Sequence, residues 1–194
     1  MLLRAALYDP ETGEFGALGH GVNNSRGKIL AMTAGSAYQG RVQSVTRGKV
    51  GAPGQLKGAA ASHIPVAELS RNTPQGIFGQ TTVGWLGQPM PVGAYQDVKT
   101  GAATIRSTVS GEEPQEYSVE ILKIYPKDRK DNRNFLLRVT DPELLEKTGG
   151  IVQGMSGSPI LQDGKLIGAV THVLVNDPTT GYGIFIENML DAAA

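Results

Sequence analysis

The stretch GMSGSPILQDGKLIGAV, residues 154–170, places a glycine-rich loop that contains a serine directly before a β-hairpin. Asp163-Gly164 lies between two apolar runs, and this dipeptide is one of the strongest hairpin signals in a sequence. In hydrolases with a Gly-x-Ser-x-Gly elbow, a helix follows the serine instead. The sequence therefore predicts a tight loop that enters an antiparallel sheet. Ser156 can be interpreted as a nucleophile or as part of a structural turn.

The rest of the chain has the pattern of an all-β protein. Its 194 residues include 26 glycines and 11 prolines, and the segments between them are short and rich in Val, Ile, Leu, Thr and Tyr. Residues 141–150, with Asp141 as N-cap, and residues 186–194 predict two short helices. Residues 48–69 are rich in Gly, Ala and Ser, and we expect a long surface loop or a crossing between two halves there. We expect one domain over residues 1–194, with that crossing somewhere in residues 50–100.

Composition and charge exclude several classes of function. Lys plus Arg and Asp plus Glu both number 18, so no net field would attract nucleic acid or anionic lipid. The absence of cysteine excludes disulfides, thiolate zinc sites and a cysteine nucleophile. We find no metal-binding or phosphate-loop motif and expect no cofactor. No apolar run is long enough to span a bilayer, so we expect no direct membrane insertion by these residues.

The loop around Ser156 fits a chymotrypsin-like plan, in which a Gly-x-Ser-Gly-x-Pro loop leads into a hairpin. The glycine two residues before the serine lets the amides of Gly154 and Ser156 point to one spot, which would form an oxyanion hole. Gly157 leaves space for an acyl group, and Pro159 begins the next strand. We therefore predict an all-β, chymotrypsin-like double β-barrel with a few short helices.

A serine nucleophile needs a base, and the chain has three histidines. His20 ends a predicted strand between two glycines and precedes the serine, as the base does in chymotrypsin-like enzymes. The alternative interpretation of His20 is a structural, half-buried histidine whose hydrogen bonds are satisfied. We expect His63 to be a surface residue. His172 belongs to the strand that would bind substrate, where Thr171, His172 and Val173 would pair with an extended peptide.

The third member of a triad would be a carboxylate that holds the other ring nitrogen of the histidine. Asp141 and Asp97 are the candidates. Asp141 lies 15 residues before Ser156, a short interval for the usual plan, and competes with its own role as N-cap. Asp97 lies in the middle of the chain, where its alternative is a charge beside a turn.

Three segments resemble the peptidase domain of the SpoIVB family, the stage IV sporulation serine peptidases. They are YDPETGEFGALGHGV, NTPQGIFG and the long stretch from TDPELLEKTGG to FIENML, residues 8–22, 72–79 and 140–190. The resemblance implies a serine endopeptidase with Ser156 as nucleophile and His20 as base, and it favours Asp141 over Asp97 as the acid. Members usually carry a membrane anchor and a PDZ domain before the peptidase, and we expect neither within these 194 residues.

The resemblance also implies a cellular role. Family members process themselves and cleave a membrane-bound regulatory protein, so that a late sigma factor is activated in the space between the forespore and mother-cell membranes. We therefore expect a protein or peptide substrate and an extracytoplasmic location. The alternative from another class is a catalytically silent peptide-binding module that keeps a protease-like cleft.

Overall fold

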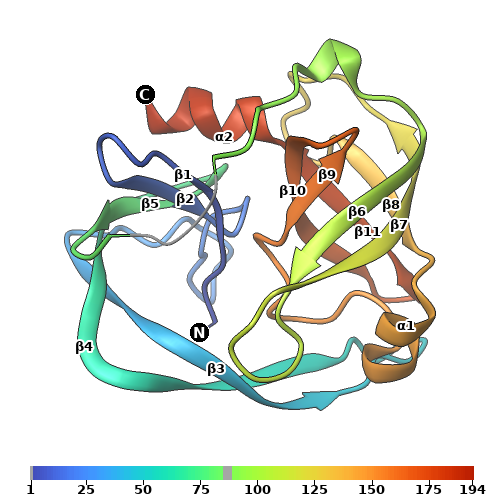
Figure 1. Ribbon diagram of the computed structural model, residues 1–194, viewed down its shortest axis with the longest axis horizontal. Helices are drawn as coiled ribbons and strands as arrows, with labels where there is room; N and C mark the ends of the chain where they lie inside the picture. Colours follow the sequence, from blue (N-terminus) through green and yellow to red (C-terminus); the bar gives the residue numbers. More distant parts are fainter. Residues whose placement is uncertain (1, 85–88) are drawn as a thin grey trace.

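Two sheets, one open and one closed, make up the part of the protein that a computed structural model describes, residues 2–84 and 89–194 (Figure 1). The open sheet has the order β1-β2-β5-β4-β3, and the closed barrel has the order β10-β11-β8-β7-β6-β9. The all-β prediction with two sheet-built halves is confirmed, but the N-terminal half does not close. The strands of the open sheet are β1 (Ala5–Tyr8), β2 (Glu14–Ala17), β3 (Gly35–Thr46), β4 (Gln55–Thr73) and β5 (Gly76–Thr81).

The closed barrel contains the stretch around Ser156. Its strands are β6 (Gly101–Ser107), β7 (Gln115–Ile124), β8 (Phe135–Val139), β9 (Pro159–Gln162), β10 (Lys165–Leu174) and β11 (Asp177–Phe185). The predicted hairpin is β9–β10, where Asp163 and Gly164 both have positive φ, 51° and 73°. A two-residue turn of this kind needs positive φ at both positions, which explains why Asp-Gly serves here.

The predicted helices are present. They are α1 (Pro142–Thr148) and α2 (Ile186–Ala193), and a short 3₁₀ helix, η1 (Tyr95–Asp97), lies in the connection between the halves. Asp141 caps α1, and Gly149 ends it in the left-handed conformation.

The expectation of a surface loop over residues 48–69 is wrong. Most of this segment belongs to β4, which pairs with β3 to form a long two-stranded ribbon that runs from the open sheet to the barrel (Figure 1). Most of its side chains are exposed, His63 among them, so the apolar alternation that marks a half-buried strand is absent. The connection between the open sheet and the barrel follows β5, between residues 81 and 101.

Helix α2 lies across both halves (Figure 1). Its Ile186 and Met189 are fully buried and pack with Phe78 of the open sheet and Ile184 of the barrel. Arg71 of β4 donates a hydrogen bond to the carbonyl of Ala193 at the end of the helix. The two halves are therefore held together by a shared apolar cluster.

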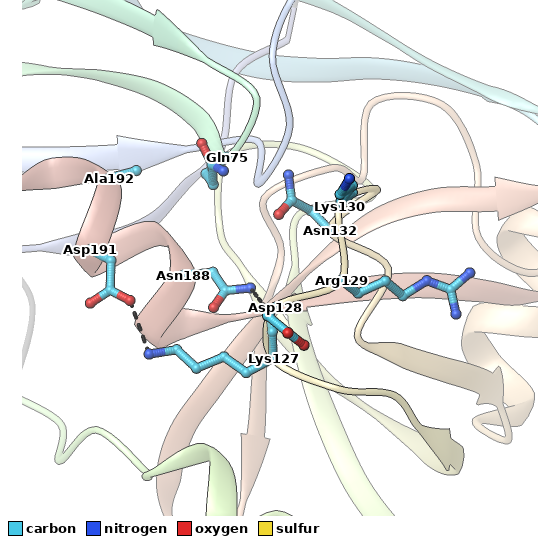
Figure 2. A pocket seen from close by; sticks show the side chains of 9 residues that line it. All are labelled: Gln75, Lys127, Asp128, Arg129, Lys130, Asn132, Asn188, Asp191 and Ala192. Carbon is cyan, nitrogen blue, oxygen red and sulfur yellow. Dashed lines mark hydrogen bonds and ion pairs between the residues drawn. The ribbon is translucent and has the colours of Figure 1, made fainter.

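A polar hollow of about 360 Å³ lies where α2 meets the loop between β7 and β8 (Figure 2). Lys127 forms ion pairs with Glu187 and Asp191 of the helix, at 3.1 and 2.9 Å. Asn132 of the same loop donates to the carbonyl of Pro74, in the turn between β4 and β5. These contacts fasten the β7–β8 loop to the open sheet. Across the described residues, no helix combines the length and apolarity needed to cross a membrane.

Candidate active site

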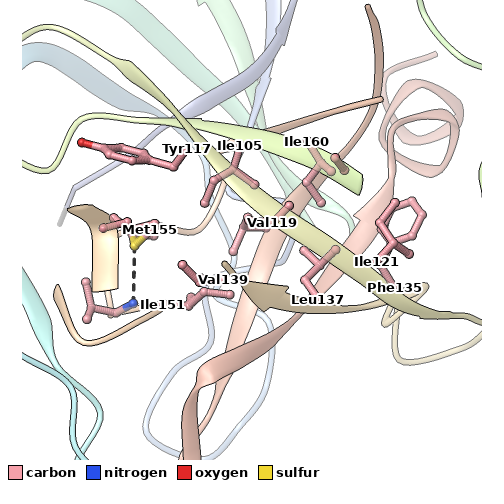
Figure 3. Close-up of a cluster of buried hydrophobic side chains, with 14 of the residues drawn as sticks. Ile105, Tyr117, Val119, Ile121, Phe135, Leu137, Val139, Ile151, Met155 and Ile160 are labelled. Atoms are coloured by element: carbon pink, nitrogen blue, oxygen red, sulfur yellow. Dashed lines mark hydrogen bonds between the residues drawn. The ribbon is translucent and has the colours of Figure 1, made fainter. Parts of the chain in front are cut away.

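The loop that carries Ser156 is anchored in the core of the barrel. Met155 is fully buried and lies among Ile105, Tyr117 and Val139 (Figure 3), and its sulfur accepts a hydrogen bond from the Val152 amide at 3.5 Å. The next residue, Ser156, is only half-buried, and its hydroxyl bonds the Thr171 carbonyl of β10. The tight loop predicted from the sequence is therefore held from below by an apolar side chain.

The hydrogen bonds that the carbonyl groups of this loop accept leave the amides of Gly154 and Ser156 free. The Gln153 carbonyl accepts from the Leu56 amide at 2.8 Å, and the Met155 carbonyl accepts from the Ser158 amide at 3.0 Å. In a planar trans peptide the N–H lies opposite the C=O, so these two bonds direct the amides of Gly154 and Ser156 to the other edge of their peptide planes. Neither amide donates a hydrogen bond to another described residue. Unpaired N–H groups of this kind are one requirement of an oxyanion hole.

The four residues predicted around the cleft lie in one chain of contacts. Ser156 Oγ donates to the Thr171 carbonyl at 2.8 Å. The ring of His172, the next residue of β10, lies 5.1 Å from the ring of His20, centroid to centroid. Gly19 is close to Thr171 as well, since a Cβ at Gly19 would be 3.0 Å from the Thr171 methyl group. His20 and Ser156, from different halves of the chain, thus contact adjacent residues of β10, His172 and Thr171, and no hydrogen bond joins their two side chains in the described structure.

His20 itself is positioned by the open sheet. It follows β2, and its Nδ1 lies 3.0 Å from the carbonyl of Gly21. The side chain of Asn72, near the end of β4, bonds both the amide and the carbonyl of Val22, at 2.9 and 2.8 Å. When Nδ1 carries the ring proton and donates it to the Gly21 carbonyl, Nε2 keeps its lone pair and can accept a proton.

His172 is held in the neutral form. Burial lowers its pKa to about 4, and the charges of His20 and Arg133 act in the same direction. Its Nδ1 is buried without a hydrogen-bond partner among the described residues. The neighbouring ring therefore contributes no positive charge beside His20 at neutral pH.

The structure does not bring the predicted acid to the base. The carboxylate of Asp141 accepts hydrogen bonds from the amides of Leu144 and Ser118, at 3.0 and 3.2 Å. Asp97 is exposed in η1 and makes no side-chain hydrogen bond to a described residue. Of the two interpretations of Asp141, the N-cap is confirmed. The acid role stays a prediction that no contact supports, because the two oxygens accept from an amide of α1 and an amide of β7, and no bond to His20 is present among the described residues.

The predicted substrate edge is available for pairing. Strand β9 pairs with β10 only as far as Ala169, whereas β11 continues along the opposite edge to Leu174. On the edge of β10 that faces β9, no strand of the described chain pairs with Thr171, His172 and Val173. An extended peptide can add there as a further strand.

Three residues that position the site carry no clear signal in the sequence. Leu56 and Arg4 bond carbonyls of the Ser156 loop, and Asn72 holds the segment after His20. Each acts across a separation of 50 residues or more. No local motif indicates such contacts. Among the described residues, no group of three or more His, Asp or Glu side chains is placed to share a metal ion.

A closed barrel and an open sheet that together present a serine, a histidine and two free amides define the class of chymotrypsin-like serine peptidases. The model of the SpoIVB peptidase S55 family matches residues 5–190, and the chain belongs to this family. It is therefore a serine endopeptidase.

Solved structures of a mycobacterial protease resemble the protein. The inactive form of a serine-to-alanine mutant of Rv3671c from M. tuberculosis H37Rv has a TM-score of 0.50 and 18% sequence identity, over 82% of this chain and 84% of that chain. The active form of the Rv3671c protease from M. tuberculosis has a TM-score of 0.48 and 18% identity, over 78% and 71% of the two chains. The likeness to the mutant supports the fold. None of the curated protein sequences matches the chain.

Proposed function

We propose that the protein hydrolyses peptide bonds through an acyl-enzyme, with Ser156 as nucleophile and His20 as general base. His20 Nε2 takes the proton from Ser156 Oγ, which attacks the peptide carbonyl, and the His20 imidazolium then protonates the leaving amine. Water hydrolyses the ester in the second half of the reaction. The observation that carries the proposal is the pair of free amides at Gly154 and Ser156, because they can hold the oxyanion of both tetrahedral intermediates.

Substrate binding would prepare the nucleophile. Ser156 Oγ donates to the Thr171 carbonyl in the free protein. A peptide that pairs with β10 presents its own N–H groups to that edge, and one of them can take the Thr171 carbonyl as acceptor. Oγ is then released and can turn toward His20. Under this proposal, Thr171, His172 and Val173 bind the substrate backbone.

The orienting group of the base would be a main-chain carbonyl. His20 Nδ1 contacts the Gly21 carbonyl, while Asp141 caps α1. We assign the tautomer of His20 to this carbonyl bond and give Asp141 a structural role. A carbonyl stabilises the imidazolium less than a carboxylate does, and so the proposal implies modest turnover.

The test is labelling of the purified chain with a fluorophosphonate probe. We expect label on Ser156 in the parent protein and none in Ser156→Ala or His20→Ala. His63→Ala is the matched control, because His63 is exposed on β4. Retained labelling in His20→Ala would refute the assignment of the base. A folded parent protein that binds peptides but takes no label would support the peptide-binding module instead.

For the cellular role, we propose cleavage of a membrane-bound regulatory protein between the forespore and mother-cell membranes, with self-processing of the enzyme. The support is membership of the SpoIVB peptidase family. Replacement of the native serine by alanine in a sporulating host should block the late sigma-factor programme and leave the regulator uncleaved. Normal sporulation in that strain would refute this role while leaving the peptidase activity untouched.

A further inference from the structure

Arg4 reaches the active-site loop from the segment before β1. Its Nε donates to the carbonyl of Gly154 at 2.7 Å, and its Nη2 donates to the carbonyl of Thr108. Both acceptors are main-chain carbonyls of the barrel, and no carboxylate pairs with Arg4 in the described chain. The contact between Arg4 and Gly154 spans 150 residues of sequence.

Arg4 is half-buried. A guanidinium that is partly shielded from water without a carboxylate is costly to keep, so its partners are informative. Burial lowers the pKa of Arg4 to about 10, and the side chain remains charged at neutral pH. A charged donor forms stronger hydrogen bonds than a neutral one, and the planar guanidinium fixes the direction of each bond. Arg4 therefore holds the two carbonyls more firmly than a backbone amide would.

The bond to Gly154 completes a set of three. The carbonyls of Gln153, Gly154 and Met155 follow one another in the chain and all accept hydrogen bonds, from Leu56, Arg4 and Ser158. The outer two bonds direct the amides of the oxyanion hole. The middle bond fixes the peptide between them, at a glycine with a φ of 96° that could otherwise rotate easily. The Met155 amide, in the same peptide plane, donates to the Val152 carbonyl at 3.1 Å. Without Arg4, that single bond would hold the peptide on one edge only.

The backbone of Arg4 connects the same loop to the segment that carries His20. Its carbonyl accepts from the Leu18 amide at 3.1 Å, two residues before His20. The same carbonyl approaches Gly157 so closely that a Cβ there would lie 2.3 Å away. One residue of the N-terminal segment thus contacts both the loop of the nucleophile and the segment of the base.

We propose that Arg4 is a positioning residue, which fixes the Gly154 peptide so that the Gly154 and Ser156 amides converge on the oxyanion. It does not touch the substrate. This inference rests on the proposed peptidase mechanism and adds to it a group from the opposite end of the chain.

The test compares Arg4→Lys, Arg4→Gln and Arg4→Met in the full chain by the kinetics of fluorophosphonate labelling. Loss of one oxyanion donor costs about 10²–10³-fold in rate in serine proteases, and we expect a fall of that order in the maximal labelling rate of Arg4→Met. The concentration of probe that gives half of this rate should not change. Arg4→Lys, which can donate to one carbonyl, should label at an intermediate rate, and methylguanidinium should speed the labelling of Arg4→Met.

Arg106→Met is the matched control, because Arg106 forms an exposed ion pair with Glu116 and should label normally. Circular dichroism separates a loss of fold from a loss of rate, and Arg4→Lys and Arg4→Gln serve if Arg4→Met does not fold. Folded Arg4 variants that label at the parent rate would overturn the inference. An unlabelled parent protein would instead refute the proposed function.

Discussion

Substitution of Asp141 distinguishes a structural role as helix cap from a catalytic role as the acid of a triad. Its two carboxylate oxygens accept from the amides of Leu144 and Ser118. In Asp141→Asn one oxygen remains to accept, while the amide nitrogen faces the second N–H, so we expect a loss of about 1 kcal/mol in the free energy of unfolding. Asp141→Ala loses both acceptors and should cost about 2–3 kcal/mol.

In a protein of this size, a loss of 1 kcal/mol lowers the melting temperature by about 2–4 °C, which calorimetry resolves. Fluorophosphonate labelling at 25 °C should stay within about threefold of the parent rate in both variants, because neither substitution touches His20. A triad acid would behave differently, since its replacement by asparagine lowers turnover by about 10⁴-fold. Such a fall in folded Asp141→Asn would refute the structural role. Asp97→Asn, at an exposed position, should change neither quantity.

Three further substitutions test the packing around the site. The pKa of His172 falls from 6.5 to about 4 on folding, so the free energy of unfolding should decrease as the pH drops through that window. We expect a decrease of about 1–2 kcal/mol after allowance for the exposed part of the ring. His172→Gln should lose this pH dependence in denaturant unfolding measured from pH 4 to 8. Gly157→Ala should lower the free energy of unfolding by about 2–4 kcal/mol, since its Cβ would clash with main-chain atoms at a φ of 88°. Its control is Gly51→Ala, at a φ of 79° in open space, which should cost about 1 kcal/mol in the same denaturant titration. Asn134→Ala should lower the free energy of unfolding by about 2–4 kcal/mol, because this fully buried side-chain amide bonds Pro126, Phe185 and Asn188. Amide hydrogen exchange in the β7–β8 loop should become faster, and unchanged exchange there would contradict that role.

The elements that the sequence predicts well are those with local causes. The Asp163-Gly164 turn and the cap at Asp141 depend on neighbouring residues alone, and both are present as expected. The place of the Ser156 loop directly before the hairpin is predictable from its short Gly-Ser-Pro motif, although distant residues hold its carbonyl groups. The all-β class follows from the spacing of glycine, proline and β-branched residues along the whole chain.

The elements that the sequence does not predict depend on distant partners. Strand β4 is stabilised by β3 and β5 and not by an apolar face, so its exposed Gly and Ala residues resemble a loop. The bond of Asp141 to the Ser118 amide has a similar origin, because the spacing of residues in the sequence does not show which distant atoms a carboxylate will contact. From the sequence alone, Arg4 resembles an ordinary surface residue, because its partner Gly154 is 150 residues away along the chain.

The long contacts of the Ser156 loop also determine when the site can form. The loop needs Leu56 and Arg4, which lie far earlier in the sequence, and it is completed by a hairpin near the end of the chain. Contacts of such high sequence separation form late in folding, because a long loop must close before they stabilise anything. A partly synthesised chain would therefore have no competent oxyanion hole, and the peptidase would gain its activity only after its last strands had joined the barrel.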